Sequence, residues 1–267
     1  MLNVGVVGLG TIGRAVCRAV DAGLPGLRLS GGFSRNATKG TESLASLVSP
    51  PPFLPVPELI EASDLVVETA TRQALEELAP QVLAAGRDLL VLSVGALLDH
   101  PEWVSLAEHH GAKIHVPSGA IAGLDGVKAA CVGPIERITM ETRKPPAGLA
   151  GAPYLREHGL SVERLTEETL LFEGPAREAC RGFPANVNVV AALSLAGLGP
   201  DATRIRIFAV PGLGRNVHDI RVVGSFGQFS VHVENVPFEE NPRTGRLSAL
   251  SAIAMLRALA SPLRLGT

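Results

Sequence analysis

The sequence predicts an α/β fold in two domains: a doubly wound parallel sheet first, then an α+β domain, with a C-terminal helix that returns to the first domain. Two observations predict it. As far as Pro117, short apolar runs alternate with helical patterns, as in successive βαβ units. Beyond Pro117 the apolar spacing changes to the alternation of half-buried strands, and an apolar helical pattern closes the chain.

The N-terminal part has the composition of buried parallel strands. Hydrophobic residues make up 46% of the chain and aromatic residues only 4%, so the core must be aliphatic. Gly86 ends one helical pattern, as a residue just past a helix does. We expect strands at Val4–Val7, Leu27–Phe33, Asp64–Glu68, Leu89–Val94 and Lys113–Val116, and helices at Ile12–Val20, Glu58–Glu61, Gln73–Ala85 and from Pro101 to Gly111.

The second part reads as an α+β segment with a mostly open sheet. A strand is expected from Ile135, where Ile138, Met140 and Thr142 alternate with polar neighbours. Further strands are expected at Thr169–Phe172, Arg204–Val210, His218–Val223 and Phe229–Val236, and helices at Pro184–Ala196 and Leu247–Leu259. We place the domain boundaries at 1–118 with 240–267, and at 119–239.

Charge and composition exclude several classes of partner. The net charge is −2 and the basic residues are scattered, which gives no reason to expect nucleic acid. No apolar run approaches the roughly 18 residues that span a bilayer. Cys17, Cys131 and Cys180 form neither a disulfide framework nor a CxxC pair, and the chain starts directly on a strand without a signal peptide. We expect a cytoplasmic protein with a small-molecule substrate, no metal site, and no membrane partner.

A glycine-rich turn follows the first strand and opens the first helix. It reads Gly8-Leu9-Gly10-Thr11-Ile12-Gly13, the pattern that binds the pyrophosphate of a dinucleotide in a Rossmann domain. The first glycine permits the tight turn, the second admits the pyrophosphate, and the third lets the helix pack on the strand. Backbone N–H groups at the helix N-terminus then face the phosphates. We therefore expect Gly8, Gly10, Thr11, Ile12 and Gly13 to bind NAD or NADP.

The residues at the end of the second strand indicate which cofactor binds. NAD-selective sites place Asp or Glu there, but this strand ends Ser34-Arg35-Asn36. A guanidinium beside a hydroxyl and an amide suits the 2′-phosphate of NADP. We expect Ser34, Arg35 and Asn36 to contact the cofactor, and NADP to be accepted, either alone or alongside NAD. The alternative is that Arg35 is solvated or stacks on adenine.

Eight short motifs occur in a fixed order over nearly the whole chain, and together they resemble the L-aspartate dehydrogenase family. They are Val-Gly-Leu-Gly-Thr-Ile-Gly at 7–13, Leu-Ser-Val-Gly-Ala at 92–96, Pro-Ser-Gly-Ala-Ile at 117–121, Asn-Val-Asn-Val at 186–189, Ala-Gly-Leu-Gly at 196–199, Arg-Asn-Val-His at 215–218, Glu-Asn-Val-Pro at 234–237 and Asn-Pro-Arg-Thr at 241–244. The resemblance implies oxidation of L-aspartate to iminoaspartate, which in some organisms feeds NAD biosynthesis.

The resemblance also implies roles for individual residues. The family's catalytic histidine falls on His218, and its cofactor contacts fall on Ala120 and Asn188. A histidine suits the chemistry, because the substrate must lose an ammonium proton before hydride leaves its α-carbon. The ordinary pKa of histidine is near 6.5, so we expect this histidine to titrate between about 6 and 8.

A dicarboxylate substrate also needs hydrogen-bond donors. Ser118, Arg215 and Asn216 lie near the motif loops and are candidates, with arginine best suited to a carboxylate. Lys144, after the strand Ile138–Arg143, is a further candidate for carboxylate binding or proton transfer. Each of these residues has an ordinary structural alternative, as a loop or strand-end side chain.

Two other readings stay open. The first is another two-domain NAD(P)-dependent reductase, similar to dihydrodipicolinate reductase or homoserine dehydrogenase. The second is a catalytically silent dinucleotide sensor, since fold alone does not decide function. In each reading, the β-branched strands of the second domain would expose a face unless something covers it. We therefore expect a homodimer or larger oligomer formed through that domain.

Overall fold

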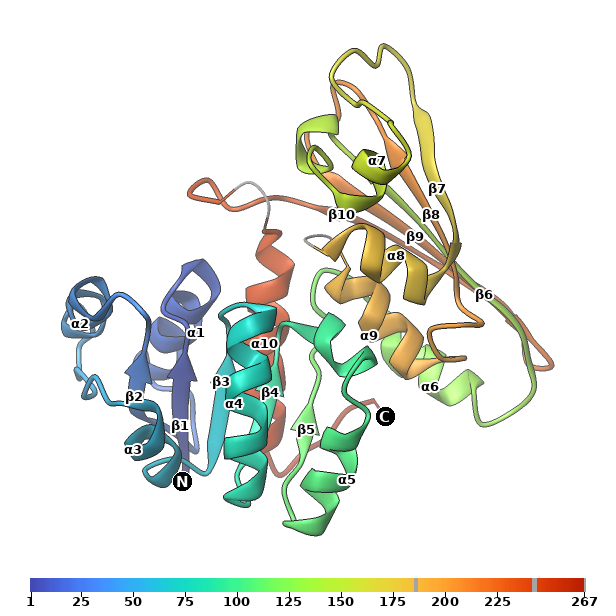
Figure 1. Ribbon diagram of the computed structural model, residues 1–267. Helices are drawn as coiled ribbons and strands as arrows, with labels where there is room; N and C mark the ends of the chain where they lie inside the picture. The colour runs from blue at the N-terminus through green and yellow to red at the C-terminus, as the bar shows by residue number, and fades with distance from the viewer. Residues whose placement is uncertain (185–186, 242–243, 267) are drawn as a thin grey trace. The chain divides into compact units, whose positions relative to one another are not determined.

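The computed structural model describes residues 1–184, 187–241 and 244–266, and the chain forms two compact units (Figure 1). Unit 1 comprises Met1–Pro117 and Ser248–Leu265, and unit 2 comprises Ser118–Leu247 with Gly266. The second boundary lies after Leu247 rather than after residue 239. An antiparallel bridge pairs Pro237 with Gly245, and both residues belong to unit 2.

Unit 1 contains one parallel sheet in the order β2-β1-β3-β4-β5. Because β2 and β3 lie on opposite sides of β1, the strand order reverses between β1 and β3, where ligands bind in open α/β sheets. Val7 is opposite both Phe33 and Glu68 in the register, so the carboxyl ends of three strands meet at one edge. The strands are β1 (Leu2–Val7), β2 (Leu27–Phe33), β3 (Leu65–Glu68), β4 (Asp88–Val91) and β5 (Ile114–His115).

Helices cover both faces of this sheet (Figure 1). On one face α1 (Thr11–Asp21) and α10 (Arg246–Ala260) pack against Val4 and Val6, with Ala252 and Leu256 of α10 fully buried. This confirms the doubly wound sheet and the returning C-terminal helix. The other face is covered by α3 (Val56–Glu61), α4 (Arg72–Ala84) and α5 (Glu102–His109). Two short elements, α2 (Ala37–Ala45) and the 3₁₀ helix η1 (Val94–Leu98), follow β2 and β4.

Unit 2 contains a mixed sheet in the order β10-β9-β6-β8-β7, in which only β6 and β8 are parallel among the paired strands. One face packs on helices through Ile138, Met140 and Ile220. The strands are β6 (Ile135–Lys144), β7 (Thr169–Pro175), β8 (Arg204–Ala209), β9 (Asn216–Gly224) and β10 (Gly227–Asn235). The helices are α6 (Leu124–Ala130), α7 (Pro153–Glu157), α8 (Ala176–Gly182) and α9 (Asn188–Ala196), with a 3₁₀ turn η2 (Pro146–Gly148).

The opposite face of this sheet, here called the outer face, is charged rather than apolar. Along β6 and β9 the buried residues are Ile138, Met140, Ile220 and Val222, which face the helices, while alternate positions carry charged side chains. The exposed face that the β-branched strands predict therefore carries mostly charged side chains. Strand alternation turns Ile138, Met140, Ile220 and Val222 inward and Arg137, Glu141, Asp219 and Arg221 outward.

None of the helices within the described ranges is long and apolar enough to cross a membrane.

Candidate active site

The glycine turn of unit 1 has the backbone that the sequence predicts. Gly8 adopts φ +99°, a conformation that other residues rarely reach, and its N–H donates to Phe33 O at 2.8 Å. A Cβ at Gly13 would overlap the carbonyl oxygen of Gly8, so only glycine lets α1 approach β1 this closely. Gly8 and Gly13 therefore fix the turn, and Gly10 is left to face a ligand.

The start of α1 fits a pyrophosphate. A Cβ at Gly10 would meet no atom within 4 Å, so the backbone there borders open space. No side chain caps the helix, and its first turn, which includes Thr11 and Ile12, contains no acidic residue. The first N–H groups of a helix have no partner within it and carry the positive end of its dipole. This end of α1 therefore supplies donors and positive potential without a competing carboxylate.

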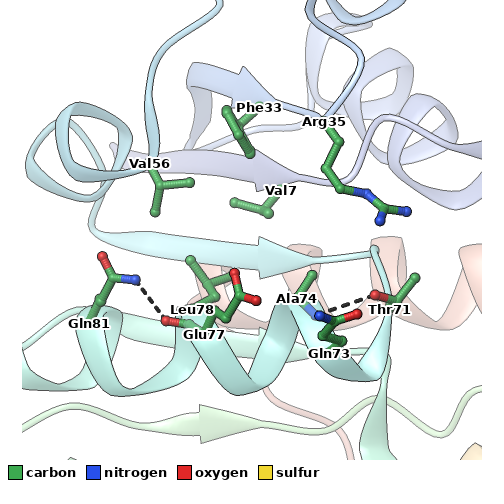
Figure 2. Close-up of a pocket in the computed structure, with 10 residues that line it drawn as sticks. All are labelled: Val7, Phe33, Arg35, Val56, Thr71, Gln73, Ala74, Glu77, Leu78 and Gln81. Atoms are coloured by element: carbon green, nitrogen blue, oxygen red, sulfur yellow. Dashed lines mark hydrogen bonds between the residues drawn. The ribbon is translucent and has the colours of Figure 1, made fainter.

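A pocket beside the same edge of the sheet fits the adenosine half of a dinucleotide (Figure 2). Its apolar surface includes Val7 and Phe33, and its rim carries Arg35 and Glu77. Figure 2 shows Arg35 and Thr71 at one end of the pocket, Gln81 at the other, and Glu77 between them. The lining residues are Val7, Phe33, Arg35, Val56, Thr71, Gln73, Ala74, Glu77, Leu78 and Gln81. The apolar walls suit an adenine ring, and the exposed Arg35 suits a phosphate.

Ser34 and Asn36 have local structural tasks besides any contact with a cofactor. The Ser34 hydroxyl donates to Asn36 O at 2.9 Å. Asn36 is the N-cap of α2, and its Oδ1 accepts from Lys39 N at 3.0 Å. Of the three predicted residues at the end of β2, Arg35 is the one that lines the pocket.

In unit 2, the predicted catalytic histidine lies in a buried polar cluster that we call the His218 cluster: His218, Thr142 and Lys144. His218 is opposite Thr142 in the register of β9 and β6, and its Nδ1 lies 3.1 Å from Thr142 Oγ1. Lys144 is two residues further along β6 and therefore points to the same face. Their exposed fractions are only 2%, 3% and 6%.

Burial sets the protonation of this cluster. Burial, and secondarily the positive charge of Lys144, lower the pKa of His218 from 6.5 to about 3. Burial lowers the pKa of Lys144 from 10.5 to about 8. At neutral pH His218 is therefore neutral and Lys144 is mostly charged. The expectation that His218 titrates between about 6 and 8 is wrong for the free protein, because it took no account of burial.

Other predicted residues lie at the same end of unit 2 as the cluster. Asn216 shares the face of His218 by strand alternation and is opposite Asn235 in the register of β9 and β10. The Asn235 side chain is 3% exposed, and its Nδ2 donates to Ala120 O at 2.8 Å. This bond holds the loop that contains Ser118 and Ala120 to the end of the sheet.

Asn188 lies beside this loop, as the first residue of α9. A Cβ built at Gly119 would lie 3.6 Å from Val189, so the loop is in contact with the start of the helix. The Asn188 side chain is exposed. Asn186, the first asparagine of the same motif, is outside the described residues.

Arg215 is not brought to His218. It precedes β9, and its Nη1 pairs with Glu234 Oε2 at 3.2 Å. Glu234 lies on the outer face, because it alternates with the inward-facing Val233 and Asn235. Lys144, which shares the face of His218 and affects its pKa, is therefore a better candidate than Arg215 for a cation beside this histidine.

Sequence reasoning missed three residues of these sites. Thr142 was recognised only as a strand residue, although it anchors His218. Glu77 enters the pocket from α4, and its only sequence signal is a spacing of four from both Gln73 and Gln81. Glu68 was predicted only as the last residue of a strand, and most of its hydrogen-bond partners are distant in sequence. Within the described ranges, no group of three His, Cys, Asp or Glu side chains is placed to hold a metal ion.

A dinucleotide-binding turn on a doubly wound sheet, with a buried histidine in a separate α+β unit, defines an NAD(P)-dependent dehydrogenase. Two family models divide the chain in the same way. Residues 8–117 match "Homoserine dehydrogenase, NAD binding domain", and residues 125–259 match "Aspartate dehydrogenase, C-terminal". The chain belongs to the L-aspartate dehydrogenase family.

Similar proteins support this membership over the full length. The chain is 47% identical to an L-aspartate dehydrogenase of Methanosarcina acetivorans, covering 100% of both chains. It is also 47% identical to L-aspartate dehydrogenase 3 of Bordetella bronchiseptica, covering 100% of this chain and 98% of that one. The crystal structure of aspartate dehydrogenase from Thermotoga maritima matches with a TM-score of 0.73 at 24% identity, over 100% of both chains, which supports the fold.

Proposed function

We propose that this protein oxidises L-aspartate to iminoaspartate with NAD or NADP as the hydride acceptor. The observation that carries the proposal is the buried His218 cluster, within the residues that match the aspartate dehydrogenase family model. Release of iminoaspartate would feed NAD biosynthesis, and its hydrolysis would give oxaloacetate and ammonia. Cys17, Cys131 and Cys180 form no disulfide among the described residues, which supports a cytoplasmic location.

The reaction removes a hydride and a proton from the amino acid. A nicotinamide cofactor held by the glycine turn of unit 1 would supply the acceptor for the hydride that leaves the α-carbon of aspartate. The α-carbon–hydrogen bond breaks, the lone pair of the neutral amine forms the carbon–nitrogen double bond, and a base removes the proton from nitrogen. Aspartate arrives as an ammonium ion, so a protein group must also take the proton that makes the amine neutral.

His218 is suited to take the ammonium proton, and it must pass that proton to solvent before it can take the second one from the imine nitrogen. Its Nδ1 is held by Thr142 Oγ1, which leaves Nε2 for the substrate. A base at Nε2 requires the tautomer with its proton on Nδ1, and in that tautomer Nδ1–H donates to the threonine hydroxyl. The low pKa means that His218 is unprotonated in the resting protein at neutral pH.

Lys144 is suited to bind a substrate carboxylate. It is charged below a pH of about 8, and a buried ammonium binds an anion strongly because little solvent screens it. Two bound carboxylates would also raise the pKa of His218 back from about 3, because nearby negative charge favours the imidazolium. Substrate binding thus makes His218 a stronger base when a proton has to be taken.

An assay with several amino acids tests the proposal. We expect reduction of NAD or NADP, followed by absorbance, with L-aspartate and not with L-glutamate or L-homoserine. Turnover of homoserine instead would favour a homoserine dehydrogenase-like activity. Tight cofactor binding without turnover of any substrate would favour a dinucleotide sensor.

The low pKa of His218 predicts how stability depends on pH. Between about 3 and 6.5 the unfolded chain binds a proton at this histidine that the folded protein does not bind, so the free energy of unfolding rises with pH over that range. Replacing His218 with glutamine should flatten this slope. Denaturant unfolding of both proteins at several pH values measures it, and equal slopes would mean that His218 keeps an ordinary pKa.

We also propose that the protein forms a homodimer through the outer face of unit 2. Positive and negative side chains alternate on this face and form ion pairs. Arg143 Nη1 lies 3.0 Å from Asp219 Oδ2, and Arg206 Nη1 lies 2.7 Å from Glu141 Oε1. A surface carrying both signs can complement its own copy across a two-fold axis. A groove on it is lined by Arg137, Thr139, Glu141, Arg206, Asp219, Ile220, Arg221, Ser230, Val231 and His232.

Light scattering at micromolar concentration should show a dimer. Arg221 is exposed on this face, and Arg221→Glu should weaken association because it reverses a charge at the interface. Arg181→Glu, on the helical layer, is the matched control and should leave the dimer intact. A wild-type monomer, or equal weakening by both changes, would contradict the proposed interface.

A further inference from the structure

Glu68 is a fully buried carboxylate at the cofactor-binding edge of unit 1. It is the last residue of β3, its exposed fraction is 0%, and it is opposite Val91, the last residue of β4. Burial raises the pKa of the Glu68 carboxyl, against four hydrogen bonds that lower it. Burying such a group is costly unless it is well bonded.

Each Glu68 carboxylate oxygen accepts two hydrogen bonds from the loops beyond the strands. Oε1 accepts from Ala70 N and Ser93 Oγ, both at 2.8 Å. Oε2 accepts from Ser93 N at 2.9 Å and Leu92 N at 3.2 Å. One side chain thus ties the loop after β3 to the loop after β4. It also explains why β4 ends at Val91 rather than at Val94, as the sequence predicted, because Leu92 and Ser93 turn toward Glu68.

The Ser93 hydroxyl does not make the hydrogen bond that an N-cap side chain usually makes. Ser93 is the N-cap residue of η1, yet it makes no side-chain cap to that helix. Its hydroxyl donates to Glu68 instead. The hydroxyl that would normally cap the short helix instead helps to hold the two loops together at the carboxyl ends of the strands.

These loops lie on the nicotinamide side of a bound dinucleotide. A doubly wound sheet binds a dinucleotide across the point where the strand order reverses, with one nucleotide on each half. In unit 1 the reversal lies between β1 and β3. The glycine turn and Arg35 belong to the β1–β2 half, and Thr71 with α4 completes the Arg35 pocket from beyond β3. The nicotinamide half therefore falls on the far side of the loop after β3, toward the end of β4.

We infer that Glu68 is a positioning residue that fixes the Ala70 and Leu92–Ser93 loops as the seat of the nicotinamide half of the cofactor. The inference rests on the proposed use of NAD or NADP. A carboxylate suits the position because it only accepts hydrogen bonds and faces only donors. A glutamine has the same shape, but its NH₂ group would replace one of the two accepting oxygens and face N–H donors. The hydrogen bonds from one side to Glu68 would be lost while the side-chain volume stays the same.

Two ligands distinguish a positioning role of Glu68 from a general effect of Glu68 on the folded structure. NADP carries the nicotinamide, and 2′-phospho-ADP-ribose is the same molecule without it. Calorimetric titration of Glu68→Gln should show NADP binding weakened by about ten-fold, while 2′-phospho-ADP-ribose binds as in the wild type. Ser93→Ala, which removes one of the four bonds, should shift the same ratio in the same direction by less, and it carries the test if Glu68→Gln does not fold.

Ser63→Ala is the matched control. Ser63 is 1% exposed and lies just before β3, at the opposite edge of the same sheet, where its hydroxyl donates to Leu59 O at 2.6 Å. Its loss should lower the melting temperature without changing the ratio of the two affinities. Equal weakening of both ligands in Glu68→Gln, or a changed ratio in Ser63→Ala, would overturn the inference. A wild type that binds neither ligand would instead refute the cofactor site on which it rests.

Discussion

Replacing His218 with alanine is expected to lower kcat for aspartate oxidation by roughly 10²–10⁴-fold, the usual contribution of a positioned acid or base. The reason is local: His218 is the neutral base of the buried cluster, and its Nδ1 is held by Thr142. The affinity for NADP should change little, because the pyrophosphate-binding turn Gly8–Gly13 belongs to unit 1 and His218 to unit 2. Steady-state kinetics and fluorescence titration of NADPH measure the two effects.

Two further variants make the His218 result interpretable. His158→Ala removes an exposed histidine from the end of α7 in the same unit and should leave kcat unchanged. Loss of NADP binding together with kcat in His218→Ala would mean that His218 is structural. Nearly full turnover would mean that another group carries the proton, and Lys144→Met would then be expected to abolish it.

The regular part of unit 1 could be predicted because each signal is local. The strand, the glycine turn and the first helix occupy consecutive residues, so spacing alone identifies them. The helix α2 was missed although Asn36 is a good N-cap, because Gly40 and the threonines around it are poor helix formers. Packing of Leu44 into the core supplies what the local sequence lacks.

The sites were less predictable than the elements. The resemblance indicated His218, but neither its hydrogen-bond partner nor its pKa follows from position in the chain. Thr142 is 76 residues away, and only the register of β6 against β9 brings the two together. The same applies to Arg215: sequence placed it three residues from His218, and strand alternation turned it to the other face.

The charged outer face shows the limit of composition. The β-branched content of β8, β9 and β10 was visible in the sequence, but the number of such residues does not say which face they occupy. That depends on the phase of the alternation, and here Ile138, Ile220 and Val222 all face the helices. The expected dimer therefore needs a different driving force: matched charge, which salt weakens, rather than apolar burial.

The cofactor preference should reverse when Arg35 is replaced by aspartate. Arg35 is the one cation among the residues that line the pocket, and Glu77 already places a carboxylate there. In the wild type we expect NADP to bind at least as tightly as NAD, because a guanidinium forms charge-assisted hydrogen bonds with a 2′-phosphate. Arg35→Asp removes those bonds and adds repulsion, so the ratio of the two affinities should shift towards NAD by about ten-fold or more.

The size of this shift should depend on salt, and that dependence identifies its cause. Arg35 is exposed, so its attraction to a phosphate is screened, and raising the ionic strength should reduce the wild-type preference for NADP. Arg28→Asp makes the same charge change at the start of the same strand, where Arg28 Nη2 bonds Asn3 Oδ1 at 2.8 Å, and should leave the ratio unchanged. Titration of each protein with both cofactors at low and high salt gives the ratios. If Arg35→Asp and Arg28→Asp shift the ratio equally, the preference comes from net charge. If neither shifts it, Arg35 is solvated or stacks on adenine, and the 2′-phosphate has another partner.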